Sequence, residues 1–241
     1  MTKVYSCLSN STKEIYVEHD DYGSLKTVVY FHGYKSDSKA TKALALKSFC
    51  KNQKISYLSF DLCGHGKSSL DLKEATLSLW VKNAKDVLEK HTTNDLILVG
   101  SSLGAWVSLL YALKNPARVK GFIGIAPAVD FVEDLLKICS QDQIQTQGGI
   151  QTNTGTWLYQ DFLKDSQKHN CLKNLKKLNF PVHILYGGQD KSVPLSLILN
   201  IMDAFSHVNP IMTYVQQGDH RLNDEVSLKE LKRVVALFSK G

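Results

Sequence analysis

Short apolar runs alternate with stretches of helical periodicity along most of this chain. The runs are rich in β-branched and aromatic residues and predict buried strands at 27–31, 55–60, 95–99, 119–126, 182–186 and 211–215. The stretches between them place apolar residues at helical spacing and predict helices at 39–51, 76–90, 105–113 and 226–239. This alternation predicts an α/β fold, with a mostly parallel, doubly wound sheet and helices on both faces. Residues 4–8 and 14–17 predict a hairpin at the edge of that sheet.

One region, from about residue 130 to residue 178, interrupts the alternation. It has helical character without a central strand, and its part from Gln141 to Gly155 is polar, rich in glutamine and punctuated by glycine. An insertion between two core strands predicts a helical cap on a single domain that spans residues 1–241. A disordered surface loop is the alternative, but Trp157, Leu158, Tyr159 and Phe162 argue against it for the second half.

The pentapeptide from Gly100 to Gly104 carries the chemistry. It has the pattern G-x-S-x-G and lies between a predicted strand and a predicted helix, which is the context of a nucleophile elbow. Glycines on both sides of Ser102 would let strand and helix approach closely around a strained turn. Ser102 is therefore the predicted nucleophile, at the N-terminus of a helix where backbone N–H groups favour negative charge.

A serine hydroxyl needs a base, and the base needs an orienting acid. His220 follows the last predicted strand, and Asp190 follows the strand before it, so both belong to loops at the carboxyl end of the sheet. The chain order Ser102, Asp190, His220 is the order expected for this kind of fold. Asp130 is the competing acid, and Asp219 is expected to hydrogen bond within its own loop.

Backbone N–H groups should stabilise the oxyanion of the tetrahedral intermediate. The expected donors are Leu103, directly after the nucleophile, and Tyr34, in the loop after the 27–31 strand. His32 is expected to shape that loop, with substrate contact as the alternative. Candidate residues for the acyl pocket are Trp157, Tyr159 and Phe162, whose alternative role is packing within the cap.

The turn from Asp61 to Ser68 superficially resembles a phosphate-binding loop. A single residue separates Gly64 from Gly66, so the G-x-x-x-x-G-K-[ST] spacing is absent and a turn beside the elbow is favoured. Cys63 in this turn is interpreted as a packing thiol. The histidines and carboxylates lack the spacing of a metal site, and a serine mechanism needs neither metal nor cofactor.

Composition and charge limit the broad class. The chain has 241 residues, 43% apolar and 22% charged, which is ordinary for a globular protein. Its formal net charge of +6 is spread along the chain, so a solvated basic surface is favoured over nucleic-acid binding. Five cysteines without a C-x-x-C pair, no apolar run of spanning length and no signal peptide predict a cytoplasmic protein without a membrane span.

The motifs together resemble the α/β-hydrolase superfamily over nearly the whole chain. Within it the chain is similar to a group of small serine esterases that includes palmitoyl-protein thioesterases and acyl-glucuronide esterases. The similar stretches are Gly33-Tyr34, Ala40 to Leu46 with Phe49-Cys50, Gly100 to Trp106, His169 to Leu172, and Asp219 to Arg221. The resemblance implies that Ser102, Asp190 and His220 form the triad. The glutamine-rich segment from Gln141 to Gln151 and the missing mitochondrial leader depart from that group.

These observations predict a serine hydrolase that cleaves small or acylated ester or thioester substrates. A non-catalytic protein that binds a small apolar ligand is one alternative. A related lyase, peptidase or haloperoxidase-like enzyme is another, whereas a dehalogenase would need a carboxylate nucleophile. The sequence predicts no particular oligomeric state.

Overall fold

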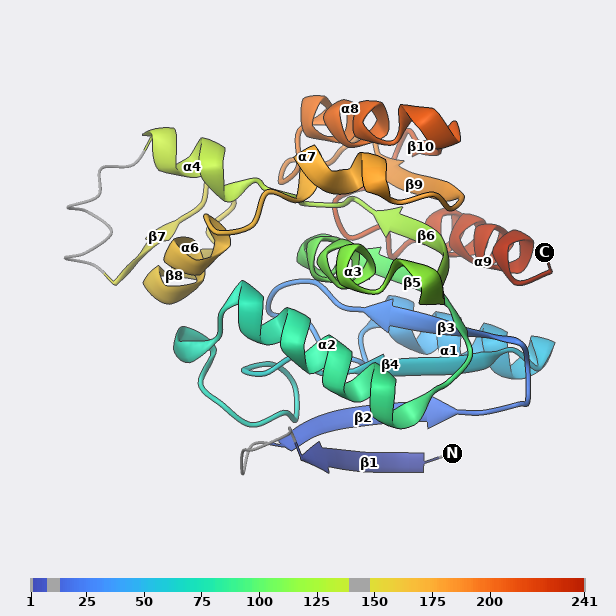
Figure 1. Ribbon diagram of the computed structural model, residues 1–241. Helices are drawn as coiled ribbons and strands as arrows, with labels where there is room; N and C mark the ends of the chain where they lie inside the picture. Colours follow the sequence, from blue (N-terminus) through green and yellow to red (C-terminus); the bar gives the residue numbers. More distant parts are fainter. Residues whose placement is uncertain (1, 8–13, 139–147, 241) are drawn as a thin grey trace.

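A single mixed sheet organises the molecule, as seen in the computed structural model (Figure 1), which describes residues 2–7, 14–138 and 148–240. Its eight strands have the order β1-β2-β4-β3-β5-β6-β9-β10. The strands are β1 (Thr2–Cys7), β2 (Glu14–Asp20), β3 (Lys26–Phe31), β4 (Ser56–Phe60), β5 (Asp95–Ser101), β6 (Val119–Ile125), β9 (Val182–Gly187) and β10 (Ile211–Val215). Six neighbouring strands of this sheet, β4, β3, β5, β6, β9 and β10, run parallel. The hairpin of β1 and β2 is antiparallel and pairs with β4 through β2.

Helices cover both faces of the sheet, as in other parallel sheets. One face carries α1 (Thr41–Gln53) and α9 (Glu225–Lys240), which pack against each other. The other carries α2 (Leu77–His91), α3 (Leu103–Lys114), α7 (Cys171–Asn174) and α8 (Leu195–Ala204), which pack in that order (Figure 1). Short 3-10 helices occur at η1 (Leu72–Glu74), η2 (Pro116–Arg118), η3 (Leu175–Lys177) and η4 (Ser206–Val208).

The central strands are apolar on both faces because each face is buried. In β3, Val28 and Tyr30 belong to the core under α1 and α9, whereas Val29 and Phe31 belong to the core under α2 and α3. Successive side chains of a strand point to opposite faces, so a continuous apolar run fills both cores. This explains why the strands are visible in the sequence as uninterrupted apolar runs.

The predicted fold class is confirmed, and so are the predicted strands, the edge hairpin and the four predicted helices, with ends displaced by a few residues. The helix α8 was not predicted. Its polar residues Ser196, Asn200 and Asp203 recur at helical spacing and are exposed, while Ile198 and Ile201 are buried. The helix was therefore missed although its sequence has helical periodicity.

The insertion after β6 lies beyond the carboxyl ends of the parallel strands (Figure 1). It contains α4 (Val132–Ile138), α6 (Gln160–Ser166) and an unpredicted antiparallel hairpin of β7 (Gly149–Gln151) and β8 (Trp157–Tyr159). We call residues 132–169 the cap. Residues 139–147 lie outside the described residues, and they include most of the glutamine-rich segment from Gln141 to Gln151. The segment from α7 onward, which was expected to belong to the cap, packs instead on α3 and α8.

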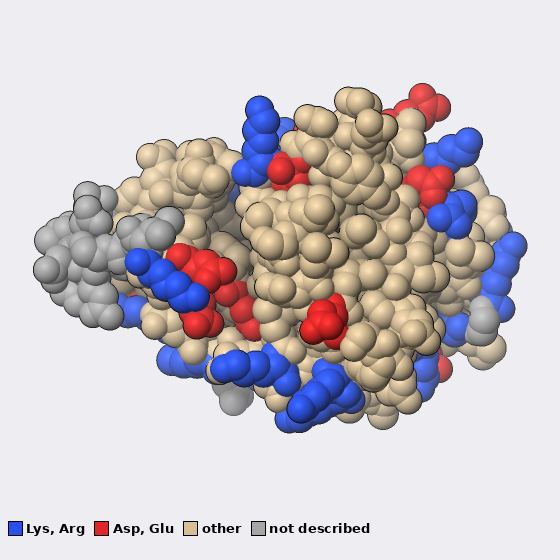
Figure 2. All heavy atoms as spheres, turned by 90° about the horizontal axis from the view of Figure 1, so that it is seen from above, with Lys and Arg blue, Asp and Glu red and all other residues tan. Residues whose placement is uncertain are grey.

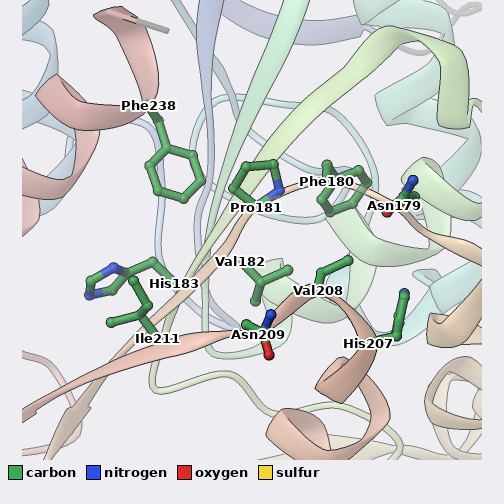
Figure 3. A pocket seen from close by; sticks show the side chains of 10 residues that line it. All are labelled: Asn179, Phe180, Pro181, Val182, His183, His207, Val208, Asn209, Ile211 and Phe238. Carbon is green, nitrogen blue, oxygen red and sulfur yellow. The ribbon is translucent and has the colours of Figure 1, made fainter.

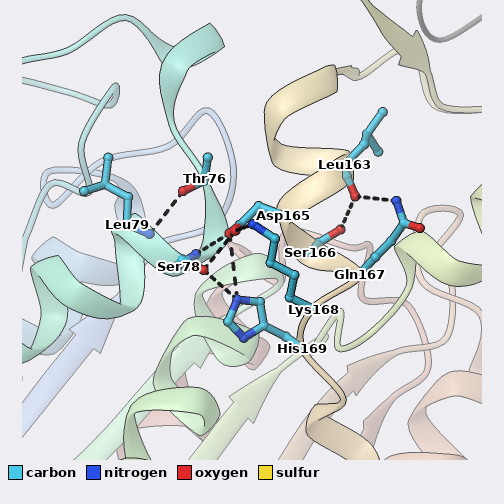
Figure 4. A network of polar contacts seen from close by, with 9 residues as sticks. All are labelled: Thr76, Ser78, Leu79, Leu163, Asp165, Ser166, Gln167, Lys168 and His169. Carbon is cyan, nitrogen blue, oxygen red and sulfur yellow. Dashed lines mark hydrogen bonds and ion pairs between the residues drawn. The ribbon is translucent and has the colours of Figure 1, made fainter.

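Polar contacts attach the cap to the start of α2 (Figure 4). The Asp165 carboxylate accepts hydrogen bonds from the Ser78 backbone N–H at 2.7 Å and from the Ser78 hydroxyl at 3.0 Å. The same hydroxyl lies 2.9 Å from His169 Nε2, and Lys168 pairs with Asp165 at 3.0 Å. Ser78 is in the first turn of α2, where backbone N–H groups have no partner within the helix. The carboxylate of α6 thus caps α2 and fixes the cap to the sheet domain.

Apolar and backbone contacts complete this attachment. The Phe162 ring packs against Trp80 at a centroid distance of 5.4 Å and against Tyr34 at 6.1 Å. At the root of the cap, Asp130 Oδ2 accepts a hydrogen bond of 2.8 Å from the Leu172 N–H. Asp130 precedes the cap and Leu172 follows it, so this bond joins the two ends of the insertion.

Candidate active site

Ser102 occupies a strained turn between β5 and α3. Its φ of 52° and ψ of −120° are unusual for a residue with a side chain. A Cβ on Gly100 would lie 2.4 Å from Ala105 Cα, and one on Gly104 would lie 2.3 Å from the Phe31 carbonyl oxygen. Strand, helix and neighbouring strand therefore meet too closely for any side chain at either position. This packing holds the turn in a conformation that it would otherwise avoid.

Substituting Gly104 with alanine should separate α3 from the end of β3. The new Cβ would meet backbone atoms of Phe31 and His32, which cannot rotate away, so we expect a loss of about 3 kcal/mol in the free energy of unfolding. Urea denaturation followed by circular dichroism measures it. The matched control is Gly23→Ala, where no atom lies within 4 Å of the added Cβ and only the positive φ of 70° opposes it. Equal stability losses in the two variants would contradict this account.

Two loops bring a histidine and a carboxylate to Ser102. His220 Nε2 lies 3.1 Å from Ser102 Oγ, and His220 Nδ1 lies 2.8 Å from Asp190 Oδ2. The Asp190 side chain is fully buried, whereas that of His220 is 26% exposed. Asp190 Oδ1 accepts hydrogen bonds from the N–H groups of Ser192 and Val193 at 2.8 and 2.9 Å. The structure thus places the predicted nucleophile, base and acid in one hydrogen-bonded row.

The competing acid Asp130 and the loop carboxylate Asp219 have other partners. Asp130 lies at the root of the cap, where burial raises the pKa of its carboxyl group despite hydrogen bonds from Leu172 and Cys171. Asp219 accepts hydrogen bonds from the N–H groups of Arg221 and Leu222, both at 2.9 Å, and so shapes the turn after His220. The described carboxylate that His220 contacts is Asp190.

The two residues expected to supply oxyanion donors lie close to Ser102. Gly33 lies against the elbow, since a Cβ there would be 3.4 Å from Ser102 Cβ. Tyr34 and Leu103 both line the cavity at Ser102, and within the described chain neither N–H is assigned a hydrogen-bond acceptor. The two residues expected from the sequence therefore line the same cavity as Ser102, and their role as oxyanion donors stays a prediction.

His32 acts between loops instead of facing the cavity. Its Nε2 accepts a hydrogen bond of 3.0 Å from the Leu62 N–H, and its Nδ1 lies 2.8 Å from the Gly33 carbonyl oxygen. Complete burial lowers the pKa of His32 to about 4. The neighbouring Asp61 carboxylate accepts from the N–H groups of Ser38 and Lys67 at 2.6 and 2.8 Å. In the turn from Asp61 to Ser68, which superficially resembles a phosphate loop, the Asp61 carboxylate thus accepts a hydrogen bond from a backbone N–H that a phosphate would need.

A cavity of about 950 Å³ opens at Ser102, between the cap and the sheet domain. Its apolar wall comes from both parts, with Leu103, Ala128, Phe131, Leu135, Leu158, Val193 and Leu197. The expected pocket residues Trp157, Tyr159 and Phe162 are not among those that line it, and neither is His32. Instead, Leu158 faces the cavity from β8. Because side chains alternate along a strand, the neighbours Trp157 and Tyr159 point to the other face.

A second hollow, of about 340 Å³, lies at the opposite end of the strands (Figure 3). It is bordered by residues at the start of β9 and β10, such as His183 and Ile211, and by Phe238 of α9. Both of its histidines already have polar partners, Thr213 for His183 and the Leu178 carbonyl for His207. The hollow is remote from Ser102.

The charged side chains and the possible metal ligands of the described residues do not indicate a second functional site. Seen from above, lysine and arginine side chains are spread among acidic ones (Figure 2), which is typical of a solvated surface. In the part of the chain that the structure describes, no three His, Cys, Asp or Glu side chains are grouped to hold a metal ion. None of the described helices is long and apolar enough to cross a membrane.

Comparisons with known proteins agree with this architecture. Residues 24–146 match the family described as Serine aminopeptidase, S33. Palmitoyl-protein thioesterase ABHD10, mitochondrial, is 29% identical in Mus musculus over 86% of this chain and 72% of that protein. The human protein of the same name is 28% identical over 87% and 71%.

Solved structures are similar over almost the whole chain. Alpha/beta hydrolase domain-containing protein 10 from mouse superimposes with a TM-score of 0.87 and 25% identity over 98% of this chain and 97% of that one. A putative hydrolase from Agrobacterium vitis S4 gives 0.88 and 23% over 99% of both chains. The predicted resemblance is confirmed: this chain belongs to the Serine aminopeptidase, S33 family of α/β hydrolases.

Proposed function

We propose that the protein is a serine hydrolase that cleaves carboxylic esters or thioesters through an acyl-Ser102 intermediate. The observation that carries this proposal is the row of Ser102, His220 and Asp190 at the opening of a cavity with an apolar wall. Relatives named palmitoyl-protein thioesterase support a hydrolase of this class at 28 to 29% identity.

In the proposed reaction, His220 Nε2 takes the proton of the Ser102 hydroxyl as Oγ attacks the substrate carbonyl carbon. The oxyanion accepts hydrogen bonds from the N–H groups of Leu103 and Tyr34. His220 then gives its proton to the leaving alcohol or thiol as the bond to the acyl carbon breaks. A water molecule, deprotonated by His220, releases the acid and restores Ser102.

Asp190 supports each of these proton transfers. Its Oδ2 accepts the Nδ1–H of His220, which leaves Nε2 free to accept the serine proton and stabilises the imidazolium that forms. The N–H groups of Ser192 and Val193 hold the carboxylate in place. The apolar wall, with Phe131 and Leu135 from the cap side, would receive the acyl chain.

Labelling with a fluorophosphonate probe tests the proposal. We expect one covalent adduct, located on Ser102 by peptide mass spectrometry, in the folded protein and none after denaturation. The p-nitrophenyl esters of acetate, butyrate, octanoate and palmitate should be hydrolysed with an optimum in chain length. An acyl thioester and an acyl amide with the preferred chain would distinguish thioesterase and peptidase activity. Absence of both adduct and turnover would instead favour a ligand-binding protein.

A further inference from the structure

A buried lysine lies beside the proposed catalytic residues, and the reaction described above gives it no role. Lys42, in the first turn of α1, lines the cavity and is only 8% exposed. Its Nζ donates hydrogen bonds to the Arg221 carbonyl oxygen and to Asn223 Oδ1, the latter at 3.1 Å. Both acceptors belong to the turn directly after His220.

Burying this ammonium group is costly. Burial lowers the pKa of Lys42 to about 8, the nearby Asp219 carboxylate raises it, and the Arg221 guanidinium lowers it. Among the described residues no carboxylate pairs with Lys42 at ion-pair distance, so its hydrogen bonds to the turn must offset much of the desolvation. An apolar side chain of similar length would avoid this cost, so stability alone does not account for a lysine here.

The turn that Lys42 contacts needs support on that side. Asp219 holds the N–H groups of Arg221 and Leu222 from within the turn, and the buried Leu222 has a positive φ of 48°. The preceding loop is tied to the acid loop, since the Gln189 N–H donates to the Gly218 carbonyl at 2.9 Å. Lys42 supplies the contact from α1, which follows the loop that carries Gly33 and Tyr34.

We propose that Lys42 is a positioning residue, which fixes the turn after His220 relative to α1 and thereby keeps His220 Nε2 directed at Ser102. This inference rests on the proposed hydrolase function for its consequence in catalysis. Lys42 joins the two sides of the cavity, the oxyanion loop before α1 and the histidine turn before α9. Without it, the imidazole would keep its bond to Asp190 but sample positions away from the serine.

Enzyme kinetics on the full chain test this role. In Lys42→Met we expect kcat for the preferred p-nitrophenyl ester to fall about 10- to 100-fold while KM changes less than about threefold, because misplacement by about 1 Å affects the chemical step. Lys42→Arg, which keeps the charge and the donors, should recover most of the loss. The matched control is Lys51→Met, which removes an exposed lysine from the same helix and should leave kcat unchanged.

A second measurement separates this proposal from the proposed function. Hydrogen–deuterium exchange of peptides covering residues 219–223 should be faster in Lys42→Met than in the wild type, and it needs no substrate. Unchanged exchange, or a kcat within twofold of the wild type, would overturn the role of Lys42 even if Ser102 is labelled. Conversely, faster exchange in a protein that hydrolyses nothing would uphold the contact and reject the hydrolase. If Lys42→Met and the milder Lys42→Gln both fail to fold, Lys42 serves the fold and the proposal is wrong.

Discussion

Replacing Ser102 with alanine is expected to abolish ester hydrolysis without unfolding the protein. The hydroxyl is the group that His220 Nε2 contacts at 3.1 Å, and alanine leaves no nucleophile at the elbow. We expect kcat to fall by at least about 10⁴-fold, the scale at which serine hydrolases lose their covalent step. Because the change removes only one oxygen atom, the melting temperature should stay close to that of the wild type. Steady-state kinetics and differential scanning calorimetry measure the two effects.

Variants of His220 and Asp190 test the other two members of the row. His220→Ala should lose about as much activity as Ser102→Ala, and the double variant should lose little more, because the two groups act as a unit. Asp190→Asn should also cost about 10⁴-fold, since an amide would favour the wrong imidazole tautomer. The control is Cys63→Ala, which removes the buried thiol of the turn after β4 and should retain activity. Loss of labelling in that control, with full labelling in Ser102→Ala, would move the nucleophile to Cys63.

Acidification should unfold the protein because two buried histidines resist protonation. Burial lowers the pKa of His32 to about 4 and that of His65 to about 3. In the unfolded chain each histidine takes a proton near pH 6.5, whereas the folded chain does not, so stability is lost as the pH falls from about 6.5 to about 4. The loss is about 3 kcal/mol for each histidine, a large part of the roughly 5–15 kcal/mol that stabilises a domain.

The hydrogen bonds explain why His32 must remain neutral. Its Nε2 accepts from the Leu62 N–H, so a proton on that nitrogen would oppose another donor. His65 is buried against the rings of His32 and Trp80, and its Nε2 has no partner among the described atoms. Urea denaturation at pH 7, 5.5 and 4.5 measures the slope. In His65→Leu the slope should be less steep than in the wild type, and an unchanged slope would contradict the assignment.

Much of the fold could be predicted from local sequence patterns. Strands buried on both faces appear as continuous apolar runs, and the G-x-S-x-G pattern between a strand and a helix located the elbow at Ser102. The row of Ser102, Asp190 and His220 followed from chain order, because loops after parallel strands gather at one end of the sheet. These inferences depend either on sequence patterns a few residues long or on the rule that loops after parallel strands gather at one end of the sheet.

The cavity wall could not be predicted in the same way. The large aromatic residues of the insertion were the natural candidates, but Phe162 packs against Trp80 and the cavity receives Leu158. Only the hairpin register distinguishes Leu158 from Trp157 and Tyr159, and a three-residue strand is too short to show alternation in sequence. Lys42 was missed because its partners, Arg221 and Asn223, lie about 180 residues away in the chain.

The hydrogen bond from the Leu172 N–H to Asp130 closes the insertion at its base, so that the insertion forms a separate unit. The two ends of the cap are joined by this bond, and Asp165 attaches α6 to α2. The hairpin of β7 and β8 is therefore not part of the strands, helices and loops that position Ser102 and His220. In the proposed hydrolase, substitutions in that hairpin should therefore alter which acyl groups fit without displacing Ser102 or His220. Variants that keep Asp130, Ser78 and Asp165 but differ in residues 149–159 should accordingly differ in substrate preference while the proposed reacting atoms stay in place.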